Sequence, residues 1–121
     1  MQRFNPFQPD EDALPPEKVR FLDVHVEPWP DGRRVRVHVR LTPFQQPPNL
    51  EMAIIDPQGR EVSHVSIIEN IDFQFVLTMH LRDPEPQPEY RLETALSYQD
   101  FEIIDRNICK FHVNFSTNGP S

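Results

Sequence analysis

The sequence has little glycine and almost no cysteine. Its three glycines, Gly32, Gly59 and Gly119, are far apart, so the chain has no glycine-rich turn that would present a nucleophile to a substrate. The single Cys109 cannot form a disulfide within the chain, which excludes a disulfide-stapled scaffold. Cys109 also falls on the inward phase of its strand, where an inert, buried thiol is expected. We therefore predict no catalytic residue and no enzymatic activity.

Long apolar runs and a surplus of positive charge are also absent. No apolar run approaches the roughly 20 residues that a membrane-spanning helix needs, and the first residues lack the charged-then-apolar order of a secretory signal. Twelve Lys and Arg residues stand against nineteen Asp and Glu, a net charge of −7 with pI near 5.1. This balance argues against nucleic acid or anionic lipid as a partner. If Met1 is the natural start, we expect a cytoplasmic location.

The stretch from Phe21 to Thr42 alternates apolar and polar residues on both sides of Asp31-Gly32, which predicts a β-hairpin. A two-residue type I′ turn at Asp31-Gly32 would satisfy both faces of the hairpin at once. The apolar pairs would be Leu22 with Leu41, Val24 with Val39 and Val26 with Val37. The polar pairs would be Asp23 with Arg40, His25 with His38 and Glu27 with Arg36.

The remaining segments predict further strands, at about 50–55, 61–69, 71–81, 90–98 and 103–115. The weak alternation of 61–69 favours a sheet edge, whereas 71–81, with Ile71 and Phe73 inward, reads as the strongest core strand. The fold prediction is all-β, a single antiparallel two-sheet sandwich of about seven strands. We assign 18–115 to this domain, 1–17 to a flexible, acidic, proline-rich tail and 116–121 to a frayed end.

Tyr90 opens the sixth predicted strand, in PEYRLETALSY, after a proline-rich crossover. This placement is similar to the tyrosine corner, in which the hydroxyl closes the preceding loop. Together with the hairpin and the Asp56 to Gly59 turn, it makes the chain resemble immunoglobulin-like and fibronectin type III-like domains. The chain lacks the inter-sheet cysteine pair, and Trp29 lies in the first hairpin. The resemblance implies a fold and no particular function.

Two kinds of binding site are compatible with this pattern. The first is protein contact with an unidentified partner or a second copy, through a strand edge at Val62, His64 and Ser66 or through the end loops. Phe4 and Phe7 either dock on the domain or form a short partner-binding motif. The alternative is a small-ligand or carbohydrate module that uses Trp29, Phe44 and nearby arginines, although Trp29 equally suits a cap on the core.

Metal and charge patterns give weaker indications. The hairpin register sets His25 against His38, but no third ligand is indicated, so we predict no metal and no cofactor. Arg33, Arg34, Arg36 and Arg40 form the basic cluster of the chain. The acids opposite them favour a cross-strand ladder of charges over an anion site.

Overall fold

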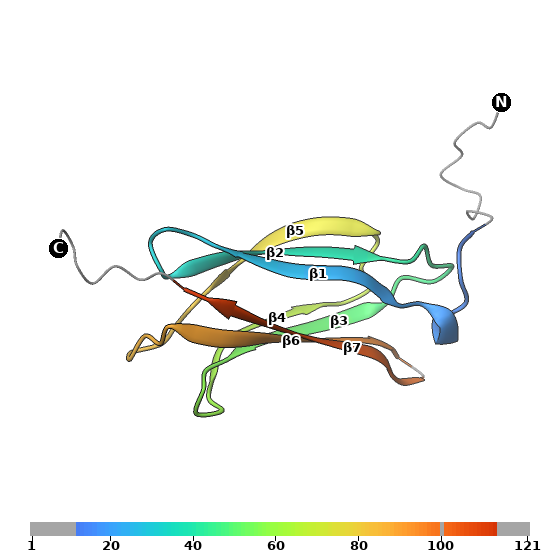
Figure 1. Cartoon of the computed structure of the whole chain (residues 1–121). Helices are drawn as coiled ribbons and strands as arrows, with labels where there is room; N and C mark the ends of the chain where they lie inside the picture. Colours follow the sequence, from blue (N-terminus) through green and yellow to red (C-terminus); the bar gives the residue numbers. More distant parts are fainter. Residues whose placement is uncertain (1–11, 100, 114–121) are drawn as a thin grey trace.

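The computed structural model describes residues 12–99 and 101–113. Two antiparallel sheets pack face to face (Figure 1), with strand orders β1-β2-β5 and β4-β3-β6-β7. A 3-10 helix, η1 (Pro16–Lys18), precedes β1 (Phe21–Pro28), β2 (Arg34–Leu41), β3 (Asn49–Ile55), β4 (Glu61–Ile67), β5 (Gln74–His80), β6 (Glu89–Tyr98) and β7 (Phe101–His112). The predicted all-β sandwich of seven strands is confirmed. Among the described residues, no helix has the length and apolar character needed to cross a membrane.

The core lies between the two sheets and comes mainly from their central strands. Side chains of a strand point alternately to its two faces, so every second residue of β2, β3 and β6 enters the core. Those with exposed fractions of 2% or less are Val35, Val37, Val39, Leu41, Leu50, Met52, Ile54, Tyr90, Leu92 and Leu96. Their period of two is the pattern from which the strands were predicted.

The predicted register of the first hairpin is confirmed over most of its length. Val24 pairs with Val39, His25 with His38 and Glu27 with Arg36. The register shifts between Phe21 and Asp23, so Phe21 takes the place opposite Leu41. Leu22 is left 52% exposed, and its predicted pairing with Leu41 is wrong because a bulge inserts one extra residue.

The turn of this hairpin differs from the predicted type I′ turn. The Trp29 N–H donates to the Arg34 carbonyl at 2.9 Å, and the Gly32 N–H donates to the Trp29 carbonyl at 3.1 Å. Pro30 has no N–H with which to close a two-residue loop. Gly32 has a φ of 68°, whereas Asp31 is not among the described residues of positive φ. The loop is therefore longer, and the register is kept because the apolar pairs set it.

The edge position predicted for β4 is confirmed, but the expectation for the next strand is wrong. β5 is itself an edge strand that pairs with β2 alone, and Met79 is its one fully buried side chain among the described residues. Ile71 and Phe73 are 75% and 39% exposed because they belong to the connector before β5. In this connector Glu69 adopts a φ of 53°, and its N–H donates to the Asn49 side chain at 2.8 Å.

The described part of the predicted tail contacts the domain. The Leu14 N–H donates to the Pro43 carbonyl and its own carbonyl accepts from Gln45, both at 3.0 Å. Leu14 forms an isolated parallel bridge with Phe44, and Ala13 and Pro16 are buried. The packed domain therefore begins before residue 18, because these apolar residues cover the end of the core.

Candidate functional site

A groove separates the edge strands β4 and β5, which belong to different sheets. β4 pairs only with β3 and β5 only with β2, so each strand turns one side of its backbone away from its own sheet. Edge strands of this kind carry unpaired N–H and C=O groups that can accept another strand. The groove has a volume of about 340 Å³.

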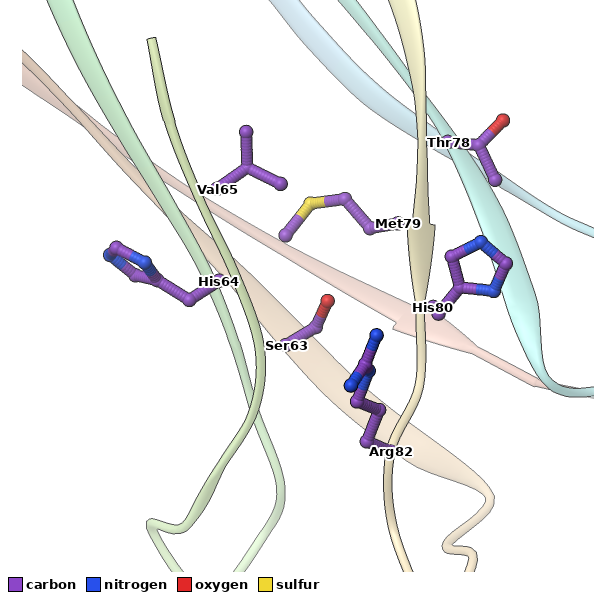
Figure 2. Close-up of a pocket in the computed structure, with 7 residues that line it drawn as sticks. All are labelled: Ser63, His64, Val65, Thr78, Met79, His80 and Arg82. Atoms are coloured by element: carbon purple, nitrogen blue, oxygen red, sulfur yellow. The ribbon is translucent and has the colours of Figure 1, made fainter.

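Four side chains point into this groove, and three lie along its rims. Figure 2 shows Ser63, Val65, Met79 and the Arg82 guanidinium directed into the gap. Met79 is 1% exposed and forms the floor, while Val65 is half-buried. The rim residues, whose side chains point away from the gap, are His64, Thr78 and His80.

Arg82 joins the two edges at one end of the groove. Its N–H donates to the Val62 carbonyl at 2.9 Å, a backbone bond between the chain after β5 and strand β4. The Arg82 side chain is exposed, and none of the ion pairs among the described residues includes it. No carboxylate lines the groove, so its charge is positive.

The edge residues predicted for contact are only partly those that face the groove. Val62 is 6% exposed and belongs to the core, which corrects its place in the predicted surface. The Ser66 hydroxyl donates to the Glu51 carboxylate at 2.7 Å, and His64 pairs with the same carboxylate at 2.9 Å. The register shift beside Ile54 and Ile55 puts two successive residues of β4 inward. The weak alternation of residues 61–69 did not indicate which of their side chains point inward.

Trp29 and Phe44 do not form one platform. They lie beyond opposite ends of β2, whose 8 residues span about 26 Å. Trp29 is half-buried, and the guanidinium carbons of Arg34 and Arg36 lie 4.2 and 5.1 Å from its ring centroid. Phe44 is 8% exposed, in the core, with its ring edge-on to Phe73 at 4.7 Å. The prediction that Trp29 and Phe44 share one surface platform is therefore wrong. Trp29 also lies outside the cluster of residues that forms the core.

Phe4 and Phe7 lie outside the described residues. Their role stays a prediction from the sequence.

The polar face of the first hairpin brings its two histidines together. The His25 and His38 rings stack with centroids 4.4 Å apart. Asp23 binds the His25 ring at 2.7 Å and Glu27 binds the His38 ring at 3.1 Å. The acids expected to pair with Arg40 and Arg36 thus contact histidines instead. Within the described ranges, no three His, Cys, Asp or Glu side chains are grouped to hold a metal ion.

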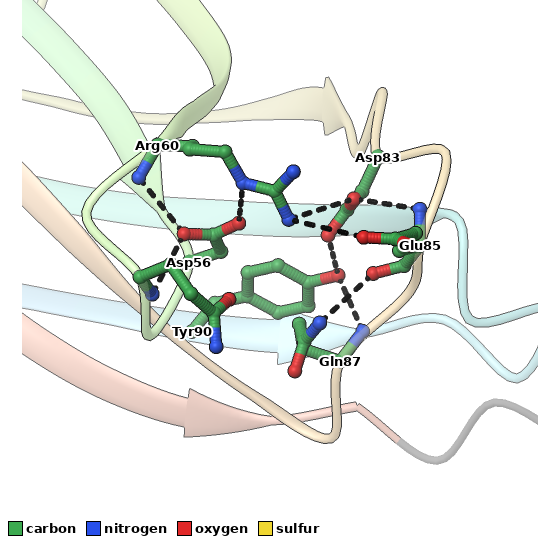
Figure 3. A network of polar contacts seen from close by, with 7 residues as sticks. Asp56, Arg60, Asp83, Glu85, Gln87 and Tyr90 are labelled. Atoms are coloured by element: carbon green, nitrogen blue, oxygen red, sulfur yellow. Dashed lines mark hydrogen bonds and ion pairs between the residues drawn. The ribbon is translucent and has the colours of Figure 1, made fainter.

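The hydroxyl of Tyr90 closes the crossover before β6, as the resemblance to a tyrosine corner implied (Figure 3). It donates to the Asp83 carboxylate at 2.8 Å and accepts from the Gln87 N–H at 2.9 Å. Burial of the phenol is the main reason that the pKa of Tyr90 rises to about 12, aided by the Asp83 carboxylate and opposed by the Gln87 N–H. This crossover is therefore fixed rather than free.

A second carboxylate extends this network to the β3–β4 turn. Asp56 is 0% exposed and accepts from the Arg60 Nε and backbone N–H, each at 2.8 Å. Arg60 also lies 3.9 Å from Asp83 and from Glu85 (Figure 3). Burial by itself raises the pKa of Asp56, but these bonds and the Gln58 N–H outweigh it, so the net pKa is lowered. This network therefore holds the β3–β4 turn and the crossover before β6 together.

Solved structures resemble this fold, although no family model and no curated protein matches the sequence. A Bifidobacterium dentium β-glucuronidase complexed with coumarin-3-O-glucuronide is similar over 78% of this chain, with a TM-score of 0.61 and 16% identity. A glycosyl hydrolase family 2 member from Bacteroides cellulosilyticus and a Lactobacillus rhamnosus β-glucuronidase give TM-scores of 0.55 and 0.53, with 17% and 15% identity over 78% and 79% of this chain.

These likenesses cover a small part of the larger chains. The matched region is 17% of the first chain, 14% of the second and 16% of the third. Similarity at this identity shows a shared β-sandwich fold and does not bear on activity.

Proposed function

We propose that this chain is a non-catalytic β-sandwich module that acts by protein contact, through the strand edges at the groove between β4 and β5. The observation that supports this most is the groove itself, in which two unpaired edges from different sheets lie next to each other. An exposed edge is a template for strand addition by a partner or a second copy. The polar networks elsewhere are satisfied and lend no support to catalysis.

The proposal includes an immunoglobulin-like connection of the strands. In constant-type domains the fourth strand joins the first, second and fifth, whereas here β4 joins β3, β6 and β7. We interpret the fold as a variant in which the fourth strand has changed sheets, and the Tyr90 corner supports this interpretation. The likeness to one-sixth of much larger chains is compatible with a module. We also retain the cytoplasmic location, on the strength of the lone Cys109 thiol.

The test compares two variants that each carry a new glutamate, one inside the groove and one outside it. Val65→Glu puts a carboxylate into the groove, whereas Val76→Glu puts the same group on the outer face of β5, where Val76 is already 53% exposed. Sedimentation velocity measures self-association, and affinity capture from native lysate with the full chain measures partner contact. We expect Val65→Glu to lose the contact and Val76→Glu to keep it.

Thermal melting of each variant separates lost contact from lost fold. If Val65→Glu unfolds, Ser63→Glu is the second groove variant, because Ser63 is already polar and half-buried. The proposal would be contradicted if the wild-type chain were monomeric and captured no protein that Val65→Glu and Ser63→Glu do not also capture. So would a contact that Val76→Glu removes and the groove variants keep.

The second candidate function is binding of an acidic small ligand or carbohydrate at Trp29. It is favoured by the two guanidinium groups stacked near the indole, which make a basic aromatic surface. Because Trp29 is the one tryptophan of the chain, its fluorescence reports on this place alone. This candidate would be favoured if glucuronate quenched the Trp29 fluorescence and Arg36→Gln weakened that quenching. An unchanged spectrum would count against it.

A further inference from the structure

We infer that the occupant of the β4–β5 groove is an extended peptide segment of another protein, bearing a carboxylate that meets Arg82. This inference rests on the proposed function and specifies the chemistry of its partner. Three features carry it: the direction of the free edges, the apolar floor and the sign of the charge.

The free edges set the shape of the occupant. The bond from the Arg82 N–H to the Val62 carbonyl closes one end of the gap. A strand added to β4 therefore runs along Ser63–Ile67, about five residues or 16 Å. Main-chain hydrogen bonds along an edge demand an extended backbone, whatever its side chains.

The floor of the groove sets the pattern of side chains. Val65 and Met79 point toward one another across the gap (Figure 2), and Ile67, Phe75 and Leu77 are half-buried apolar residues packed against the core from the same two strands. A strand laid over such a floor presents every second side chain to it. The occupant should therefore alternate apolar and polar residues.

The charge of the groove sets the end of the segment and argues against a second copy. Arg82 is exposed and outside every ion pair of the described residues, whereas His64 on the rim is already paired with Glu51. A two-fold pairing of this surface with itself would bring a second Arg82 to the interface and no carboxylate from the groove lining. A carboxylate on the partner offsets the charge instead, and Arg82 can bind it through two N–H groups.

A pair of peptides tests this inference directly. The probe is Glu-Thr-Val-Thr-Val-Thr-Glu, with acetyl and amide ends and a fluorescent label, and its control replaces both Glu residues with Gln. A carboxylate at each end allows either strand direction. We expect fluorescence anisotropy to show that the acidic peptide binds about three- to fivefold more tightly, as for an exposed ion pair, with a smaller ratio at high salt.

Two variants of the full chain locate the effect. Arg82→Gln should reduce the ratio between the two peptides to about one while the control peptide binds as before, because it removes the cation and keeps the edge. Val65→Glu should remove binding of both peptides, and Val76→Glu should change neither. Amide chemical shifts should move along Ser63–Ile67 when the acidic peptide is added.

The outcomes separate this inference from the proposed function. Equal binding of both peptides, or a preference that survives Arg82→Gln, overturns the carboxylate and leaves edge contact in place. Absence of binding by either peptide overturns the peptide occupant, and a contact measured by sedimentation then identifies a second copy instead. If Val65→Glu also has no effect on any contact, both proposals are overturned.

Discussion

At the scale of single residues, the two tyrosines show how burial controls an ionisable group. The phenols of Tyr90 and Tyr98 are both almost fully buried, and the Tyr98 hydroxyl donates to the Gln46 carbonyl at 2.9 Å. Burial favours the neutral phenol, which raises the pKa of Tyr98 to about 12 as well.

Alkaline titration should therefore separate the folded from the unfolded chain. The absorbance of ionised tyrosine should appear near pH 12 in the folded protein and near pH 10 in denaturant. Because the folded pKa values lie above the ordinary one, the neutral buried phenols contribute fully to the free energy of unfolding below pH 10. That contribution is lost as the pH rises toward 12. A folded protein that ionises either phenol near pH 10 would contradict the burial described.

Removal of the Tyr90 hydroxyl tests the tyrosine corner. Tyr90→Phe deprives the buried Asp83 carboxylate and the Gln87 N–H of a partner, and an unsatisfied buried group costs about 1–3 kcal/mol. Tyr98→Phe is the matched control, with an expected loss of about 1 kcal/mol. Urea unfolding measures both. A smaller loss for Tyr90→Phe than for Tyr98→Phe would show that the hydroxyl does not hold the crossover.

At the scale of elements, the β3–β4 turn depends on one backbone conformation. Gly59 has a φ of 87°, and a Cβ added there would meet nothing within 4 Å. Any cost of Gly59→Ala therefore comes from the left-handed backbone, about 1 kcal/mol. Gly59→Asn should cost less, since asparagine tolerates this region. Equal losses in denaturant unfolding would argue against a conformational cause.

Elements with a strict period of two could be predicted from the sequence, and elements shaped by neighbours could not. The register of β1 and β2 follows from facing valines, so it was predicted even though the turn was not. The edge position of β5 depends on which strand lies beside it, and Ile71 and Phe73 look the same in a core strand and in a connector. Pro30 was a usable signal for the longer loop, because it lacks the N–H that a two-residue loop requires.

The candidate site was predictable only as a region. The weak alternation of 61–69 correctly indicated an edge, yet the bulge at Val62 decides which residues face the groove. Met79 belongs to the other sheet and Arg82 to the chain that follows β5, and no local pattern joins them to β4. Phe44 was missed as a core residue because its burial depends on Leu14 and Phe73.

At the scale of the whole molecule, stability should fall in acid partly through the Asp56 network. The pKa of Asp56 is lowered from 3.8 by the Arg60 and Gln58 donors, which outweigh the effect of burial. Its contribution is therefore present above pH 3.8 and is lost as the pH falls through the lower folded value. Urea midpoints measured from pH 7 to pH 2 should show this decline. Asp56→Asn should be less stable at pH 7 and show a shallower decline, and an unchanged slope would contradict the assignment.

The left-handed backbone of Glu69 implies that the thermal stability of this protein can be raised at this position. A side chain at a φ of 53° costs about 1 kcal/mol that glycine would not. Glu69→Gly should raise the melting temperature by no more than about 4 °C, because the extra freedom of glycine in the unfolded chain offsets part of the relieved strain. A lower melting temperature in a thermal scan would contradict this. The connector between β4 and β5 is therefore a position at which the protein can be made more stable.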